Sequence, residues 1–267
     1  MNLLKTLLFI TICVTISLTS VWSLPPVSEL LDKLDNLQSL TGDLSAKVNL
    51  TQQKAGQGVK VYDSIFYRRD KDDTFLMIVI GPDYEKGNGY LKVGDNMWMY
   101  RRNTRTFQHI NRDESISGTD SKAGDFEKNK RSELYMGATN AAGKELISEE
   151  MLGKVPVYKF ELLAKVNDVT YPKQIYWVER ETSLPRKVQS YSLSGTLMQT
   201  SYFLKYTQID GKYFMLKSMF VDEFEGVSVK DNVTNKENKT IMEISGISLQ
   251  KIDDSIFTKA YLENLSK

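Results

Sequence analysis

The second half of the chain is a succession of short runs in which apolar and polar residues alternate, and this feature constrains the fold most. The runs occupy 155–163, 172–179, 185–193, 197–208, 212–222, 227–231 and 240–249. Turn residues such as Ser194-Gly195 and Asp210-Gly211 separate them. A period of two places alternate side chains on opposite faces of a strand, and short turns join antiparallel neighbours. We therefore expect an antiparallel meander, which should curl because long open sheets rarely stay flat.

The first half of the chain adds further strands and a few helices. Strand patterns cover 44–53, 59–68, 74–80, 90–93, 97–101 and 107–111. Val27, Leu30, Leu31, Leu34 and Leu37 share one face of a helical repeat, which predicts a helix over 27–40. Shorter helices are expected near 124–134, 144–150 and 254–265. The sequence therefore predicts a mainly β fold with few helices, of the α+β class.

The first residues have the three parts of a secretory signal peptide. Lys5 gives the short N-terminal region its positive charge, and residues 6–18 form an apolar run. Val21 and Ser23 occupy positions −3 and −1 of a cleavage site before Leu24. The apolar run is shorter than the ~20 residues that cross a bilayer as a helix. We therefore expect residues 1–23 to be removed during export and residues 24–267 to form a single domain.

Composition excludes several classes of function. The only cysteine, Cys13, lies in the predicted signal peptide, so the mature chain would have neither disulfides nor thiolate chemistry. The 35 basic and 34 acidic residues balance, which argues against nucleic-acid binding. His109 is the only histidine and lies in a strand-like stretch, and no nucleophile-elbow motif accompanies it. We therefore predict no catalytic residues, no metal site and no cofactor.

The strands carry many large apolar side chains in regular spacing. The sets are Met97-Trp98-Met99-Tyr100, which is apolar on both faces, and three one-faced sets: Tyr158, Phe160 and Leu162; Ile175 and Trp177; and Met198, Tyr202, Leu204 and Tyr206. An apolar sheet face must be buried under other elements, and methionine suits the wall of a pocket because it repacks easily. The spacing fits a packed core and a ligand pocket equally well.

The segment 83–100 resembles a signature of the bacterial outer-membrane lipoprotein-sorting proteins, the LolA-like family. It reads DYEKGNGYLKVGDNMWMY, which is similar to the family pattern KGxGYLKxGDNxWxY. A basic stretch with Arg101, Arg102 and Arg105 follows. Weaker similarities recur at 118–120, 125–126, 153–158, 176–178, 184–188, 209–213 and 252–258. The resemblance covers nearly the whole mature chain.

This resemblance implies a periplasmic protein with a strongly curved antiparallel half-barrel and helices over its concave face, with a hydrophobic cavity between them. It also implies a non-enzymatic carrier or chaperone. The expected partners are lipid or lipoprotein acyl chains, an inner-membrane exporter and an outer-membrane acceptor, with only transient membrane contact. The candidate cavity residues are Leu30, Leu34, Leu37, Trp98, Tyr100, Tyr158, Phe160, Leu162, Trp177, Met198, Tyr202 and Leu204.

The helix over 27–40 is the expected lid of such a cavity. Closing it over the empty sheet would compete with cargo, so that Leu34→Asp should weaken both lid closure and ligand retention. The alternative function is a non-enzymatic envelope interaction protein, whose sheet is simply packed by its own helices.

Overall fold

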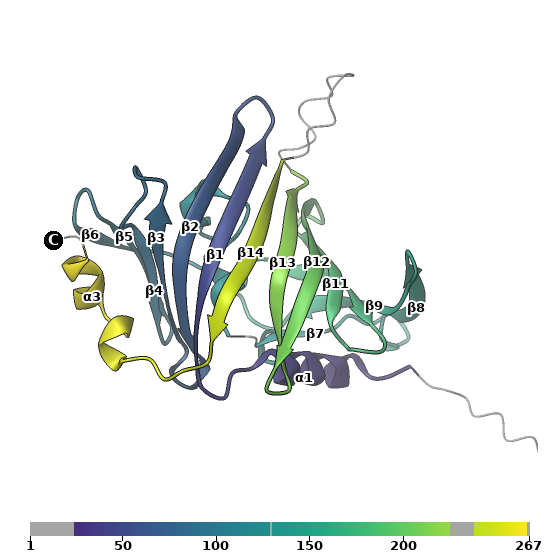
Figure 1. The fold of residues 1–267 in the computed structure, drawn as a ribbon. Helices are drawn as coiled ribbons and strands as arrows, with labels where there is room; N and C mark the ends of the chain where they lie inside the picture. Colours follow the sequence, from purple (N-terminus) through teal and green to yellow (C-terminus); the bar gives the residue numbers. More distant parts are fainter. Residues whose placement is uncertain (1–23, 129, 225–237, 266–267) are drawn as a thin grey trace, which may run out of the picture.

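The computed structural model describes residues 24–128, 130–224 and 238–265, and β-strands dominate them. They form one antiparallel sheet of fourteen strands in the order β6-β5-β4-β3-β2-β1-β14-β13-β12-β11-β10-β9-β7, and β8 pairs with β9 (Figure 1). Two meanders meet where β14 pairs with β1. The last strand of the chain thus joins the two halves of the sheet.

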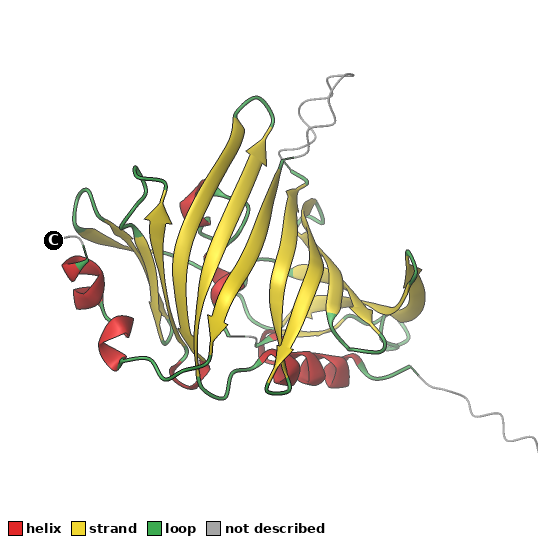
Figure 2. Ribbon diagram, viewed as in Figure 1, coloured by secondary structure: helices red, strands yellow, loops and turns green. Residues whose placement is uncertain are grey.

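The observed elements follow the predicted ones closely. The strands are β1 (Asp43–Lys54), β2 (Gly58–Arg69), β3 (Thr74–Gly81), β4 (Gly89–Val93), β5 (Asn96–Arg101), β6 (Thr106–His109), β7 (Tyr135–Gly137), β8 (Ile147–Leu152), β9 (Val155–Ala164), β10 (Lys173–Glu179), β11 (Pro185–Tyr191), β12 (Leu197–Ile209), β13 (Lys212–Asp222) and β14 (Lys239–Ser248). The α-helices among the described residues are α1 (Val27–Gln38), α2 (Arg131–Leu134) and α3 (Lys259–Asn264), shown in red in Figure 2.

One face of the sheet, the inner face, is crossed by a segment that we call the roof segment, residues 110–134. In Figure 1 this teal segment lies behind β1 and β2. Its side chains Ile116, Ala123 and Phe126 join a core cluster with the alternate residues of β1 to β5. Within β1 the inward Val48 and Leu50 are buried, which matches the period-two pattern of this strand.

The other face of β3 to β5 is covered by the C-terminal segment. Ile252, Phe257 and Leu262 pack there with Leu76 and the other outward residues of these strands. A glycine at position 89 makes this contact possible. A Cβ atom there would lie 2.6 Å from Cδ2 of Leu262 and 3.1 Å from the carbonyl oxygen of Met77. Strands β3 to β5 are therefore buried on both faces.

Helix α1 packs at the other half of the sheet, across the lower ends of β12 and β13 in Figure 1. Its buried residues are Val27, Leu30, Leu31 and Leu34. They form a second cluster with Tyr135, Phe160, Leu162, Tyr176, Val178 and Val188. The amphipathic pattern predicted this helix correctly, and the structure ends it two residues earlier, at Gln38.

The structure corrects two expectations. The stretch 144–150 is not a helix: Ile147–Leu152 is a strand, because β9 offers it a pairing edge from Ile147↔Phe160 to Leu152↔Val155. The sheet is also open and not strongly curled. Its order runs from β6 at one edge to β7 at the other without a pairing that would close it, and β1 and β2 pair without interruption from Asp43↔Arg69 to Lys54↔Gly58.

Several expectations concern residues outside the described ones. The signal peptide at 1–23 and the strand at 227–231 both lie there, so both stay predictions. The assignment of 24–267 to a single domain also stays a prediction. Within the described ranges, no helix has the length and apolarity needed to cross a membrane.

Candidate functional site

Hydrogen bonds fix the middle of the roof segment to the sheet. The Asp120 amide donates to Thr240 Oγ1 at 3.0 Å, and this hydroxyl donates in turn to Asp120 Oδ2 at 2.7 Å. Gln199 Nε2 donates to the Asp120 carbonyl oxygen, and Gln52 Nε2 to that of Gly118, both at 2.7 Å. Three strands, β1, β12 and β14, thus hold the roof by polar side chains on their inner face.

Two adjoining cavities lie between the roof segment and the inner face. The first has a volume of about 210 Å³ and the second about 130 Å³. Their shared wall residues are Asp125, Glu127, Arg131, Phe203, Met215 and Met242. Because so much of the wall is common, the two cavities form one divided space.

The walls of this space differ in polarity. The sheet contributes an apolar floor, made of Leu44, Phe66, Val188, Phe203, Phe214, Met215, Phe220, Met242, Ile244 and Ile247. The roof contributes charged residues, namely Arg112, Asp125, Glu127, Lys128, Lys130 and Arg131. A space with an apolar floor and a charged roof suits an amphiphilic ligand better than a purely polar or purely apolar one.

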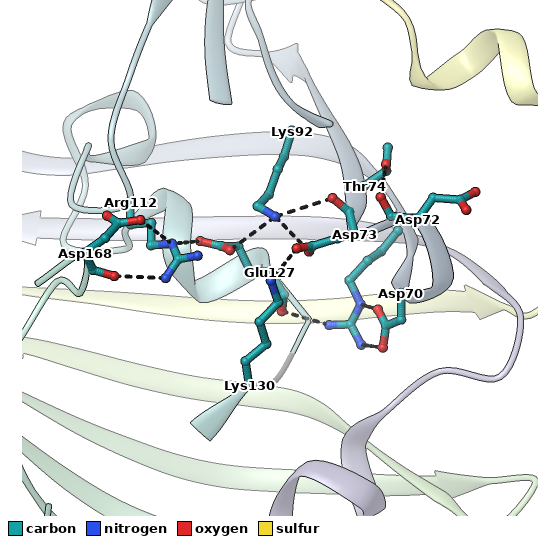
Figure 3. A network of polar contacts seen from close by, with 10 residues as sticks. Asp70, Asp72, Asp73, Thr74, Lys92, Arg112, Glu127, Lys130 and Asp168 are labelled. Atoms are coloured by element: carbon teal, nitrogen blue, oxygen red, sulfur yellow. Dashed lines mark hydrogen bonds and ion pairs between the residues drawn. The ribbon is translucent and has the colours of Figure 1, made fainter. Parts of the chain in front are cut away.

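A network of ion pairs holds the end of the roof segment to β4 and to the turn before β3 (Figure 3). The ammonium group of Lys92, which is almost fully buried, lies 2.7 Å from Asp73 Oδ1 and 3.4 Å from Glu127 Oε2. Lys130 also pairs with Asp73, and Arg112 Nε lies 3.0 Å from Glu127 Oε1. The roof is thus attached through buried charges, which are costly to separate.

Burial and pairing shift the pKa values of the carboxyl groups in opposite directions. Burial disfavours the ionised form of Asp73, but hydrogen bonds from Lys130 and Lys92 outweigh it and hold the pKa of Asp73 below its ordinary value. Burial raises the pKa of Glu127, an effect that Arg112 and Lys92 only partly offset. Network members on the roof and on the sheet therefore depend on each other for their charge states.

Asp125 behaves differently from the networked carboxyl groups. Its side chain lines both cavities, and desolvation by the surrounding protein raises the pKa of its carboxyl group to about 6. It accepts hydrogen bonds from the Lys122 amide at 2.7 Å and from Ser121 Oγ at 3.2 Å. Asp125 therefore changes charge close to neutral pH inside the wall of both cavities.

Helix α1 is attached to the far end of the roof by one aspartate. Asp35 Oδ2 accepts from the Ser132 amide at 2.8 Å, and Asp35 Oδ1 accepts from Arg131 Nη1 at 3.3 Å. Only Gln38 of α1 lines one of the two cavities. The structure therefore gives the role of cavity cover to the roof segment, while α1 anchors the end of that segment.

The structure brings some of the predicted cavity residues together in the cluster under α1. Leu30, Leu34, Phe160 and Leu162 are all buried in it, and the half-buried Tyr158 packs against its edge. Leu37 is half-buried near the end of the same helix. These residues lie on the inner side of β9, but none of them lines the two cavities.

The remaining predicted residues lie elsewhere. Trp98 and Tyr100 belong to the cluster under the C-terminal segment, on the face opposite Met97 and Met99. Trp177 is covered by lysines, with Lys187 Nζ 4.5 Å from the ring centroid. Met198 and Tyr202 are half-buried and Leu204 is 50% exposed. On β12 the cavity is lined instead by Gln199, Ser201 and Phe203.

Sequence reasoning therefore missed the charged roof residues and the polar floor residues. The signals that could have found them are the segments 118–120 and 125–126, which resemble the lipoprotein-sorting family and which form the middle of the roof. No group of three or more histidine, cysteine, aspartate or glutamate side chains that could hold a metal ion exists within the part of the chain that the structure describes.

The fold defined by this sheet and its roof matches solved structures over nearly their whole length. A LolA superfamily protein of Nitrosomonas europaea aligns with a TM-score of 0.71 and 20% identity, over 89% of this chain and 100% of that one. A putative outer membrane lipoprotein-sorting protein domain of Vibrio parahaemolyticus gives 0.73 and 17%, over 88% and 97%. A DUF1329 family protein of Desulfovibrio piger gives 0.73 and 18%, over 88% and 97%. The chain thus has the LolA-like fold, as the motif at 83–100 predicted.

A protein-family model defines the relationship further. The model described as "-like: Uncharacterized protein" matches residues 71–264, so the chain belongs to that family. The matched region begins just before β3 and ends within the last residues of α3, and it includes the whole roof segment. No curated protein matches the chain.

Proposed function

We propose that this chain is an exported, non-enzymatic carrier that binds the acyl chain of a lipid or lipoprotein between the inner face and the roof segment. The observation that carries the proposal is the divided cavity, whose apolar floor lies under a separately anchored roof. The LolA-like fold supports it, because one matching structure is described as a lipoprotein-sorting domain. Residues 1–23 would direct export, with cleavage near Ser23 and release into the periplasm.

The size of the cavities suggests how such a carrier would bind and release its cargo. Volumes of about 210 and 130 Å³ are each below the ~300–1,000 Å³ of ordinary ligand pockets. A full acyl chain therefore requires the roof to rise or the floor methionines to repack. Burying sixteen methylene groups would contribute about 12 kcal/mol, and the cost of opening offsets part of this gain. Binding would then stay reversible, which a carrier needs.

Reversible binding also fits the expected partners. An inner-membrane exporter would load the chain, an outer-membrane acceptor would remove it, and the carrier would touch either membrane only transiently. The residues predicted from the sequence, such as Leu30, Leu34 and Phe160, would form the adjacent core that a longer acyl chain reaches when the roof opens.

Native mass spectrometry of the exported, purified protein, followed by organic extraction, tests the proposal. We expect a co-purifying lipid, or uptake of added oleic acid in a stoichiometric complex. A clean mass that stays unchanged after lipid is added would contradict it. That result would favour the alternative of an envelope interaction protein, to which the small volumes of the two cavities also point.

A further inference from the structure

We infer that the roof segment selects amphiphiles with a single anionic headgroup, which Lys128 and Arg131 bind at the first cavity while the tail enters the second. This inference rests on the proposed function and specifies its ligand. The shared chemistry is a carboxylate or a phosphate attached to an alkyl chain.

The two cavities differ in a way that orients such a ligand. Polar side chains of the strands, including Gln174, Ser190 and Gln199, line the first cavity together with the charged roof. The second cavity has none of these three strand residues among its described walls and has Phe66, Phe126, Phe214, Ile244 and Ile247 instead, while Arg68, Asp125, Glu127 and Arg131 form its charged side. A headgroup in the first cavity and a tail in the second would each find a matching environment.

Lys128 is available to bind the headgroup. Its side chain is half-buried and lines both the first cavity and the polar groove outside it, so it lies at the rim. Lys130 and Arg112 are already engaged by Asp73 and Glu127. Among the described residues, none forms an ion pair with Lys128. An anion entering the cavity would therefore meet at its mouth an ammonium group without a direct ion-pair partner among the described residues, although Asp32, Asp35, Asp70 and Glu133 line the same outer groove.

Arg131 lies where the two cavities meet. It lines both of them, and its Nη1 donates to Asp35 Oδ1 at a distance of 3.3 Å. Tyr176 also interacts with this guanidinium group. Since a guanidinium has five N–H donors in a planar fork, these two contacts leave donors for a carboxylate or phosphate. Arg131 thus marks the boundary between the polar and apolar compartments.

The acidic residues of the walls do not cancel this preference. Glu127 is compensated by Lys92 and Arg112, at 3.4 and 3.0 Å. Asp125 is the remaining carboxyl group, and it is mostly protonated below about pH 6 because burial raises its pKa to about 6. In the protonated form it would donate a hydrogen bond to an anionic headgroup rather than repel it.

The test compares oleic acid with its uncharged methyl ester, and with a lysophosphatidic acid that has the same chain. Affinities are measured by displacement of a fluorescent alkyl probe from the full mature chain. Lys128→Met should weaken binding of both acids about tenfold, as expected for loss of one charged hydrogen bond, and leave the ester unchanged. Lys128→Arg should restore the affinity for both acids. Lys60→Met, at an exposed position of β2, is the matched control and should change nothing.

The outcomes separate the inference from the proposed function. If Lys128→Met leaves acid binding intact, or weakens acid and ester equally, headgroup selection is refuted while the carrier function stands. If none of the three ligands binds the wild-type chain, both are refuted. A loss confined to lysophosphatidic acid would identify phosphate as the headgroup, and a loss confined to oleic acid would identify carboxylate. Either result supports an anionic site.

Discussion

At the scale of single residues, the buried lysine of β4 has the largest consequence for stability. Lys92 is 1% exposed, and its ammonium group is shared between Asp73, in the turn before β3, and the roof residue Glu127. Removing one member of a buried ion pair leaves the other charge without compensation in a medium of low dielectric constant. The family-like motif at 83–100, which contains Lys92, therefore has a structural role in holding the roof.

Lys92→Met should destabilise the chain by about 3–5 kcal/mol, because it leaves Asp73 and Glu127 with one cation each in a buried site. Urea unfolding of the mature chain measures the change. Lys60→Met removes the same charge at an exposed site and should have an effect of less than about 0.5 kcal/mol. Equal effects of the two substitutions would show that the network adds nothing to stability.

Asp125 predicts a specific pH dependence. Its pKa is raised by folding from 3.8 to about 6, so the folded chain binds a proton more tightly than the unfolded one. The stability that this group contributes is therefore full at low pH and is lost as the pH rises through that interval. Asp125→Asn should raise the midpoint of thermal unfolding above that of the wild type at about pH 7.5 and have no effect at about pH 4.

The control for Asp125→Asn is Asp95→Asn, which removes the same charge from an exposed turn. A gain at about pH 7.5 that appears in both variants would assign the effect to net charge rather than to the cavity wall.

At the scale of elements, the strands could be predicted because one of their faces is buried. In β1 the buried Leu44, Ala46, Val48 and Leu50 alternate with polar residues, and the predicted span 44–53 differs from the observed one by a residue at each end. The stretch 144–150 could not be predicted, because its state depends on pairing with β9 rather than on its own composition. The hydrophobic pattern of a segment indicates which residues are buried, but it does not indicate which strand edge is available for pairing.

The same dependence on tertiary contacts explains why the cavity residues expected from the sequence differ from those that line the two cavities. Met97-Trp98-Met99-Tyr100 is apolar on both faces, so the sequence does not tell which face a cover will occupy, and two different covers occupy the two faces. On β12, apolar spacing favoured Met198, Tyr202 and Leu204, whereas Gln199 and Ser201 line the cavity. Polar residues of a strand usually face solvent, and here they face an internal space that is itself partly polar.

The C-terminal helix provides a prediction about one element. Gly89→Val should loosen α3, because even a Cβ at this position would lie 2.6 Å from the buried Leu262 side chain and 3.1 Å from a backbone oxygen. Hydrogen exchange of residues 252–265 should become faster, while that of α1 stays unchanged. Gly42→Val is the control, since no atom lies within 4 Å of a Cβ built there. Unchanged exchange in the Gly89 variant would mean that α3 shifts without loss of packing.

At the scale of the whole molecule, some regions that pack against the sheet are filled by side chains and one region contains open space. The α1 cluster and the C-terminal cluster are filled by their own side chains, and they supply the apolar burial that a fold without disulfides needs. The region under the roof segment keeps open space between them. On the inner face, the packed cluster under α1 and the open space under the roof segment thus lie side by side, while the C-terminal cluster packs the opposite face.

This division makes it possible to block the ligand space without damaging the fold. Met215 is half-buried and lines both cavities, so Met215→Trp should narrow the space where they meet and reduce lipid uptake while leaving stability nearly unchanged. Met219 lies on the same strand and faces the other way, paired with Tyr202 and Ile241, so Met219→Trp makes the same chemical change outside the cavities.

The readout is thermal unfolding with and without an alkyl ligand. A ligand at one hundred times its Kd stabilises the folded state by about 2.7 kcal/mol, so its addition should raise the unfolding midpoint of the wild type and of Met219→Trp. Met215→Trp should show a smaller rise. If the ligand stabilised both variants equally, it would have to bind outside the space under the roof segment, on another face of the sheet.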